Sequence, residues 1–395
     1  FGNTAASGET PTPMLGFATT GPAIVRVAAK IKNADNTYST NPDHNKNAKW
    51  FAVFASGPQG PIDTVTHSFK GESDQNLRIF IVDLATGELL RTIDTELANA
   101  FAGSLASSTL DADRSKQDSS GYYSDDVVYV GYVQKDATVT PATWTKGGVL
   151  RITTKESTDP DDWVVSKLID GVGPVTTSAT KLQDRANKKL WVYFGTGRYY
   201  YKSDDSSTTQ QALYGVKEPC YNTTANTLNK TCTATVDKDD ITDQTGSGAA
   251  PASTLAATAT GWKIVLDAKD DANAYLTERV ITDPLAAPNG AVFFTTFKPS
   301  GDLCNYGGSS LLWAVRYDSG STPPASAMQG KALMQVSTGA FAEIKLSDAF
   351  SNPDSTRYDG RRLATPITGV PPTAQGLSLF SNPPPAKKLL HVREK

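Results

Sequence analysis

The sequence is poor in histidine, in long apolar runs and in clustered positive charge, and each scarcity excludes a class of protein. None of the three histidines, His44, His67 and His391, stands in a metal-binding spacing such as His-x-x-x-His. No apolar run approaches the roughly 20 residues that a helix needs to cross a bilayer. Lysine and arginine are scattered and the net charge is −3, whereas a nucleic-acid-binding domain usually carries a basic stripe. We therefore expect no nucleic-acid partner and no direct membrane span.

Motifs of common enzymes are also absent. The chain has neither the Gly-x-Ser-x-Gly turn of hydrolases nor the Gly-x-x-x-x-Gly-Lys-Ser/Thr loop that cradles phosphates. The glycines in Phe194-Gly195-Thr196-Gly197 precede no expected helix, so we interpret them as a strand end that turns sharply. These absences predict that the chain is not an enzyme.

The three cysteines bear on the cellular compartment. Cys220 and Cys232 lie in one Asn/Thr-rich, loop-like segment, and their spacing suits a local disulfide in an oxidising compartment. Two unpaired thiols are the alternative. Cys304 is left as a buried small residue or a free thiol, although either of the other two cysteines could be its partner.

The length and the amino terminus bound the domain organisation. The chain begins at Phe1, without methionine, in a Gly/Thr/Pro-rich stretch, and we interpret it as a fragment of a longer protein. Its 395 residues suffice for one large propeller or two ordinary domains. With 38% hydrophobic and 20% charged residues, the composition is that of a globular protein.

A weak internal repeat is the most informative feature of the sequence. Short runs rich in β-branched and aromatic residues, bounded by Gly, Pro, Asn and Asp, recur in sets of about four. The expected strands are 22–30, 50–56, 77–83 and 89–94 in the first set; 103–110, 126–133, 148–153 and 163–169 in the second; 175–181, 189–195, 212–217 and 261–267 in the third; 278–283, 291–297, 310–317 and 332–336 in the fourth; and 362–368, 376–380 and 388–392 in a poorer fifth.

The sets resemble one another position by position. Their second strands read Phe-Ala-Val-Phe, Val-Val-Tyr-Val-Gly, Trp-Val-Tyr-Phe-Gly and Val-Phe-Phe-Thr. Such nearly continuous apolar character is typical of strands covered on both faces, as in a blade between two neighbours. We predict an all-β fold: an irregular, insertion-rich β-propeller of four-stranded blades, closed or open, with only short turns at 96–102 and 346–350. An irregular β-sandwich assembly is the alternative.

Polar insertions explain the long and uneven repeat, which is roughly 60 to 100 residues against ~40–45 in simple propellers. The insertions span 33–47, 111–125, 202–209 and 218–260, and the last contains Cys220 and Cys232. We expect residues 1–395 to form one propeller domain. The segment 218–260 is expected to be peripheral, so that its deletion leaves the fold intact and weakens partner binding.

Several motifs occur together that are similar to those of the C-terminal domains of PilY-type proteins. Their order and number carry the resemblance, which extends from about residue 21 to residue 312. The motifs are PAIVR at 22–26, WFAVFASG at 50–57, LWVYFGTGRY at 190–199, QQALYGV at 210–216, RVITDP at 279–284, FFTTF at 293–297 and GDLCNYGG at 301–308.

The resemblance to the PilY family implies an exported protein of the type IV pilus, located near the filament tip at the bacterial surface. It implies a role in pilus assembly and retraction, adhesion and twitching motility. The implied partners are minor pilins or other tip subunits, or a host or mineral surface.

The family also implies a calcium site, in a loop of the form Asp-x-Asp/Asn-x-Asp-Gly-x-x-Asp before a Val-Tyr-x-Gly strand. The loop here is longer than that form, Lys116 replaces the glycine, and the acidic insertion offers substitute ligands, including Asp125. Calcium takes six to eight oxygen ligands, and alternate acidic residues can aim their carboxylates at one point. The alternative is a solvated acidic turn. The candidate ligands are Asp111, Asp113, Ser115, Asp118 and Asp126.

Two further features leave alternatives open. A propeller enzyme of the quinoprotein-dehydrogenase type is the second candidate function, since such enzymes combine calcium with many tryptophans. All six tryptophans except Trp144 lie in expected strands, where they suit blade packing, and no adjacent cysteine pair is present to stack on a quinone. Tyr199, Tyr200 and Tyr201 enter a polar loop, where they could recognise a partner or cover a blade edge.

Overall fold

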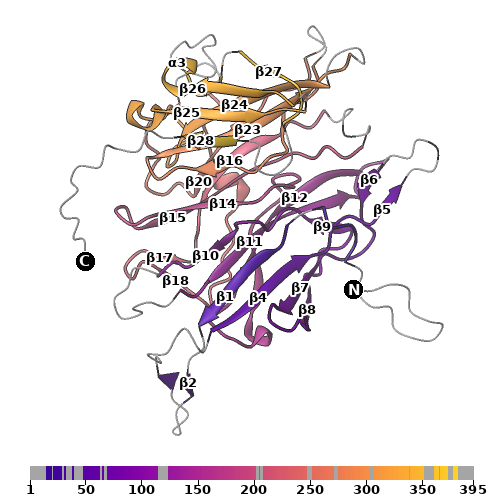
Figure 1. Cartoon of the computed structure of the whole chain (residues 1–395), viewed down its shortest axis with the longest axis vertical. Helices are drawn as coiled ribbons and strands as arrows, with labels where there is room; N and C mark the ends of the chain where they lie inside the picture. The colour runs from indigo at the N-terminus through magenta and orange to yellow at the C-terminus, as the bar shows by residue number, and fades with distance from the viewer. Residues whose placement is uncertain are drawn as a thin grey trace, which may run out of the picture.

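Five β-sheets follow one another along the chain and along the long axis of the molecule (Figure 1). The computed structural model describes residues 15–19, 21–28, 31–32, 38–39, 48–62, 65, 69–113, 123–201, 204, 208–246, 251–270, 275–302, 307–337, 339–350, 360–363, 365–371 and 377–380. No helix in these ranges has the length and apolar character of a membrane span.

The first three sheets match the first three predicted sets in order, although of the strands predicted at 103–110 and 175–181 only residues 109–110 and 180–181 are in strands. The first sheet has the order β1 (Ala23–Ala28), β4 (Ala48–Ala55), β7 (Arg78–Asp83) and β8 (Leu89–Asp94). The second has the order β10 (Thr109–Leu110), β11 (Val127–Asp136), β12 (Thr143–Thr153) and β13 (Val164–Asp170), with β9 (Ala100–Ala102) beside β11. The third has the order β14 (Thr180–Asp184), β15 (Lys189–Gly195), β16 (Ala212–Lys217), β20 (Gly261–Val265) and β19 (Thr242–Asp243).

The remaining strands form two further sheets and three small hairpins. The fourth sheet has the order β21 (Arg279–Val280), β23 (Ala291–Pro299), β24 (Gly308–Arg316) and β27 (Ile367–Thr368), with β22 (Leu285–Ala286) beside β23. The fifth has the order β26 (Phe341–Lys345), β25 (Lys331–Gln335) and β28 (Leu377–Phe380). The hairpins pair β2 (Ile31–Lys32) with β3 (Tyr38–Ser39), β5 (Gly60–Ile62) with β6 (Phe69–Glu72), and β17 (Tyr221–Asn222) with β18 (Thr227–Leu228).

Adjacent sheets share hydrophobic cores, and these cores hold the stack together. Between the first and second sheets, Phe51 and Trp163 meet edge to face with their ring centroids 5.2 Å apart. The third and fourth sheets enclose the buried rings of Trp262 and Trp313, and similar cores lie between the second and third and between the fourth and fifth. Because an inner sheet is covered on both faces, strands such as β11, β15 and β24 are almost wholly buried.

The stack is open rather than closed into a ring. In the described part of the chain, no strand pairing and no hydrophobic core joins the first sheet to the fifth. The fold is thus an irregular propeller-type arrangement of blades with almost no helix, as the sequence predicts. Five sheets in succession are not the two packed sheets of a sandwich, so the sandwich alternative is wrong.

The sequence assigns some carboxy-terminal strands wrongly. Residues 332–336 are predicted to end the fourth set, but β25 pairs with β26 and β28 in the fifth sheet, and β27 completes the fourth. The short helical turn η4 (Ala325–Met328) redirects the chain between β24 and β25, because Ala327 and Met328 are buried between the two sheets. Of the predicted turns, 96–102 instead runs into β9, whereas 346–350 forms α3 (Leu346–Ala349). The strand predicted at 388–392 lies outside the described residues.

The insertion at 218–260 is not peripheral. It carries β17, β18, β19 and the short turn η3 (Lys238–Asp240). Five of its side chains are buried in the core between the second and third sheets: Cys220, Tyr221, Leu228, Val236 and Ile241. The expected peripheral position is therefore wrong, and we now expect the deletion to open that core.

Close packing explains the glycines that end β15. A Cβ atom on Gly195 would lie 2.3 Å from Cγ2 of Val280 in the fourth sheet. One on Gly197, whose φ is +154°, would lie 2.5 Å from the carbonyl oxygen of Val280. The two sheets approach so closely here that only glycine fits, and the sharp strand end is a packing requirement.

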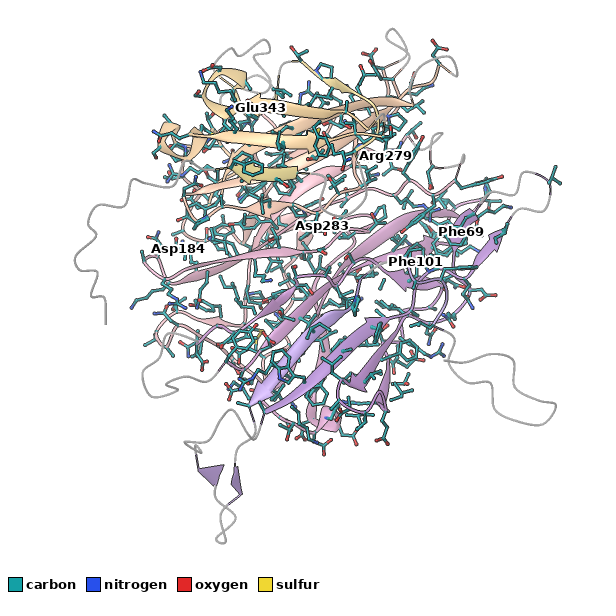
Figure 2. The ribbon with its side chains drawn as sticks, viewed as in Figure 1. Phe69, Phe101, Asp184, Arg279, Asp283 and Glu343 are labelled. Atoms are coloured by element: carbon teal, nitrogen blue, oxygen red, sulfur yellow. A yellow bond between two sulfur atoms is a disulfide. The ribbon has the colours of Figure 1, made fainter. Side chains whose placement is uncertain are left out.

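The tyrosines that follow these glycines divide between the two predicted roles. Tyr200 is half-buried and packs edge to face on Phe69 of the β5–β6 hairpin and on Phe101 of the second sheet, so it covers the edge between them. Tyr199 remains partly exposed beside Phe297, at a centroid distance of 5.3 Å. Figure 2 labels Phe69 and Phe101 at this edge of the molecule.

Candidate metal centre

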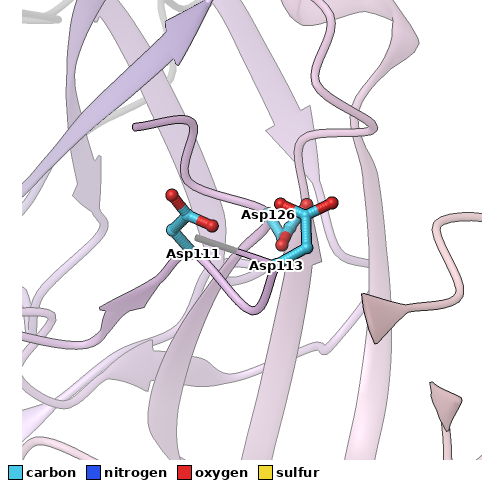
Figure 3. A group of neighbouring side chains, drawn as sticks. All are labelled: Asp111, Asp113 and Asp126. Carbon is cyan, nitrogen blue, oxygen red and sulfur yellow. The ribbon is translucent and has the colours of Figure 1, made fainter. Parts of the chain in front are cut away.

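Three carboxylates gather at the two described ends, residues 111–113 and 123–126, of the loop between β10 and β11; we call these two ends the metal loop. Asp111 and Asp113 follow β10, and Asp126 directly precedes β11, so the pairing of these strands brings both ends of the loop together. One carboxylate oxygen of each residue lies within 4.8 Å of the other two (Figure 3). The structure thus groups three of the five predicted ligands. Ser115 and Asp118 lie outside the described residues.

Two of these carboxylates are buried with one oxygen each unsatisfied. Asp111 and Asp126 expose only 6% and 1% of their surface. Ser124 donates its backbone N–H to Asp111 Oδ2 at 3.2 Å, and Ala112 donates its own to Asp126 Oδ2 at 2.9 Å. The Oδ1 atom of each aspartate has no hydrogen-bond partner among the described residues. A buried polar atom left in this state costs free energy, and a bound cation would remove that cost.

The neighbouring Asp125 is not part of the three-carboxylate group. Its Oδ2 accepts a hydrogen bond from the N–H of Arg26 at 2.9 Å, and its own N–H donates to the Arg26 carbonyl at 2.8 Å. The N–H of Ala28 donates to Ser124 Oγ at 3.3 Å. These contacts fix the end of the metal loop on β1, at the edge of the first sheet.

Burial strongly affects the protonation of the site. Desolvation of the charged form raises the pKa of Asp111 to about 7 and that of Asp126 to about 8, and the nearby Asp113 adds like-charge repulsion. When no cation is present, both carboxyl groups therefore keep their protons to a higher pH than an exposed aspartate does. A cation would displace these protons, because only the ionised carboxylate is a good ligand.

The donor set fits a hard divalent cation. Carboxylate oxygens are the ligands that calcium and magnesium prefer, whereas zinc prefers cysteine and histidine. Within the described residues, only aspartates form the group. Asp111 and Asp126 are buried, which does not fit the alternative of a solvated acidic turn at these two residues.

The residues that surround the three carboxylates could not be predicted from the sequence. Lys230, in the 218–260 insertion, forms an ion pair with Glu156 at 2.5 Å. Lys230 lowers the pKa of Asp126 and Glu156 raises it, although both effects are smaller than that of burial. Thr154 donates its N–H to the carbonyl of Asp126 at 3.0 Å. These residues are far apart in sequence, so no spacing pattern could have revealed them.

The predicted disulfide between Cys220 and Cys232 is present, with an S–S distance of 2.02 Å. It closes a loop around the β17–β18 hairpin inside the insertion. Cys304 lies outside the described residues. Structural disulfides persist in oxidising compartments, so this bond favours a location outside the cytoplasm.

A cleft of about 810 Å³ opens where the β5–β6 hairpin meets segments of the second, third and fourth sheets and their connections. Its charged lining is balanced. Arg198 pairs with Asp204 at 2.7 Å, and Arg279 donates to the carbonyl of Asp204 at 2.8 Å, so both guanidinium groups brace the chain. All three histidines lie outside the described residues. The charged lining residues are Lys70, Glu72, Asp136, Arg198, Asp204 and Arg279.

Comparison with known proteins defines the fold class. No family model and no curated protein matches the sequence. The chain is similar in structure to a family-43 glycoside hydrolase (7% identity, 76% of this chain and 72% of the other, TM-score 0.28) and to an α-L-arabinanase of Cellvibrio cellulosa (8%, 79% and 84%, 0.30). These two likenesses are too weak to support an argument.

One likeness is closer. The crystal structure of the PilY1 C-terminal domain of Pseudomonas aeruginosa superposes with a TM-score of 0.50 and 15% identity, covering 84% of this chain and 71% of that one. The chain therefore has the fold of a PilY1 C-terminal domain, as the resemblance in sequence predicts. At this identity the likeness establishes the fold alone.

Proposed function

We propose that this chain is a non-enzymatic, exported component of a type IV pilus, with a calcium site in its metal loop. Its place is at the filament tip on the bacterial surface, where it acts in pilus assembly and retraction, adhesion and twitching motility. The observation that carries this proposal is the buried carboxylate group of Asp111, Asp113 and Asp126 in a chain with the fold of a PilY1 C-terminal domain.

The first sheet offers a surface that suits a protein partner. Its outer face carries a row of apolar side chains across all four strands, because Ile24 pairs with Ala52, Ala52 with Val82, and Val82 with Leu89. The ends of the row, Ile24 and Leu89, are exposed, whereas Ala52 and Val82 in its middle are buried. Beside this row lie Trp50 and Leu84, 46% and 48% exposed. Trp50 is opposite Arg26, whose guanidinium lies 6.0 Å from the indole centroid.

The fifth sheet ends the stack differently. Its outer face alternates charged and apolar groups, and Lys331 pairs with Glu343 across it at 2.5 Å. Terminal units of stacked folds usually turn a polar face to solvent. The outer face of the fifth sheet carries this ion pair beside two exposed rings, Phe341 and Phe380, so it meets the expectation only in part. On the first sheet, Trp50 and Leu84 are exposed beside an apolar row. We therefore assign the outer face of the first sheet to a pilin-like subunit of the tip, and adhesion to a host or mineral surface remains a further role of the assembled tip.

Charge introduced on this face should release the partner. We expect Trp50→Lys to reduce the amount of protein that co-sediments with sheared pili at least about tenfold, because an ammonium group would be desolvated in the interface. The matched control is Phe341→Lys, which alters an exposed ring on the fifth sheet and should leave co-sedimentation unchanged. Equal loss in both variants, or loss in neither, would contradict the assignment.

Calcium should stabilise the protein measurably. At a hundredfold excess over the dissociation constant, a specific ligand adds about 2.7 kcal/mol to the free energy of unfolding. We expect the melting temperature of the protein to be higher in calcium than in chelator. Asp111→Asn should abolish this difference. Magnesium should stabilise less, since it resists the loss of its water ligands. If calcium leaves the melting temperature of the wild-type protein unchanged, the proposal of a calcium site is wrong.

The pilus role is tested in cells. Cells that lack this chain should lose surface pili and twitching, and the wild-type chain should restore both. Normal pili and twitching without the chain would refute the pilus role, whatever the result for calcium. The quinoprotein alternative has no supporting observation, because the cleft is charge-balanced and the sequence lacks the adjacent cysteine pair.

A further inference from the structure

The disulfide-closed part of the insertion, residues 220–232, lies beside the metal loop and is linked to it by side-chain contacts. Gln183 on β14 donates from Nε2 to the carbonyl of Ala112 at 2.5 Å and to the hydroxyl of Tyr221 at 2.9 Å. Tyr221 follows Cys220 in sequence, and Ala112, Cys220 and Tyr221 belong to the same hydrophobic core. The side chain of Gln183 thus bridges Tyr221, which follows Cys220 of the disulfide, and the backbone of Ala112, which follows Asp111.

A second contact starts from the other end of the disulfide loop. Lys230, two residues before Cys232, pairs with Glu156, and both side chains are largely buried. The loop that holds Glu156 binds the metal loop through Thr154, whose hydroxyl donates to the carbonyl of Asp125 at 2.6 Å. The insertion is therefore linked to the metal loop near both of its ends, through Gln183 at one end and through Glu156 and Thr154 at the other.

Arg151 and a small set of further contacts hold the disulfide-closed segment in position. Arg151 holds the chain on both sides of the disulfide loop, since it pairs with the carboxylate of Glu218 and donates from Nη2 to the carbonyl of Ala234 at 2.8 Å. Between these anchors, the segment is held by the two-residue β17–β18 ladder, the disulfide, the burial of Tyr221 and Leu228, and a hydrogen bond from the N–H of Asn229 to the carbonyl of Cys220. Opening the disulfide would give this segment much more conformational freedom.

We propose that the Cys220–Cys232 disulfide controls the affinity of the metal loop for calcium, acting through Tyr221 and Gln183 on one side and Lys230 on the other. This inference rests on the proposed calcium site. Reduction moves two electrons and two protons from a dithiol to the disulfide, which yields two protein thiols and the oxidised, cyclic dithiol. The released segment no longer supports the loop, and calcium binds more weakly.

Linkage makes the effect reciprocal. If oxidation strengthens calcium binding by some factor, calcium must favour the oxidised form by the same factor. Couplings between sites are typically about 5- to 150-fold, and with two polar contacts we expect roughly tenfold. A disulfide with a merely structural role would lower stability when reduced, but calcium would not shift its redox equilibrium.

The direct test compares calcium dissociation constants of the oxidised and dithiothreitol-reduced protein by calorimetric titration, with Cys304→Ser as the common background. We expect binding about tenfold weaker after reduction. Equal dissociation constants overturn the inference and leave the calcium site standing. Absence of calcium binding in both forms overturns the calcium site itself.

The reciprocal test keeps the same chain in a dithiothreitol redox buffer and counts thiols by alkylation and mass. Calcium should raise the ratio of oxidised to reduced protein about tenfold, and Asp111→Asn should remove this dependence. If the reduced protein unfolds, Tyr221→Phe removes the hydrogen bond between Gln183 and the Tyr221 hydroxyl while the disulfide stays intact. Calcium should bind this variant several-fold more weakly than the wild-type protein. Lys230→Met should act likewise, with the exposed Lys238→Met as control. Wild-type affinity in both Tyr221→Phe and Lys230→Met refutes the relay.

Discussion

Replacing Arg151 by methionine should lower the free energy of unfolding by about 3–5 kcal/mol, the range expected when a buried ion pair loses one partner. The side chains of Arg151 and Glu218 are fully buried and paired between the second sheet and the start of the insertion. Glu218 also accepts hydrogen bonds from the hydroxyl of Tyr129 at 2.8 Å and from the N–H of Cys220 at 2.9 Å. Without the guanidinium, a carboxylate would remain buried with no compensating charge.

Urea unfolding measures this loss, and a surface ion pair provides the control. Lys167→Met removes a pair with Asp170 whose partners are about two-fifths exposed, so it should cost at most about 1 kcal/mol. The double variant Arg151→Met, Glu218→Leu should recover part of the loss, because no charge is then left buried. A loss below about 1 kcal/mol for Arg151→Met alone would show that the ion pair does not fasten the insertion.

The strands of the inner sheets could be predicted because burial on both faces requires apolar residues at consecutive positions. Runs such as those of β11, β15 and β23 are apolar on both faces, since each sheet is covered by two neighbours. The last strands could not be assigned in this way. β26 and β28 alternate between exposed and partly buried positions, and the chain reaches them through turns that no repeat anticipates.

The insertion shows why long-range packing escapes sequence analysis. Its buried residues, including Tyr221 and Leu228, stand singly among asparagines and threonines, so composition indicates a peripheral loop. The partner that fastens it, Arg151, lies in another sheet. Nothing local distinguishes an arginine that will be buried from one that will face solvent, because the pairing arises only when the sheets stack.

The metal loop is the opposite case. Asp111, Asp113 and Asp126 flank two paired strands, so local sequence and strand pairing suffice to bring them together. What the sequence could not supply is their burial, which depends on the neighbouring sheets. Burial is also what makes the site sensitive to pH.

In chelator, the stability of the protein should fall as the pH rises from about 5 to 8.5. Both carboxyl groups titrate near pH 4 in an unfolded chain, whereas the folded protein raises the pKa of Asp111 to about 7 and that of Asp126 to about 8. The folded state therefore holds protons that the unfolded state has released. Their contribution to stability is complete below about pH 4 and is lost as the pH passes the folded values.

Calcium should reverse this trend, because it replaces the protons that the buried carboxylates would otherwise need. Below the folded pKa values each proton displaced weakens calcium binding about tenfold per pH unit, so the gain in melting temperature from calcium should grow from pH 5.5 to 8.5. Asp111→Asn, which keeps the shape and removes one titrating group, should flatten the pH profile in chelator. A calcium increment that is the same at pH 5.5 and 8.5 would mean that the ion binds carboxylates already ionised, and hence not the buried pair.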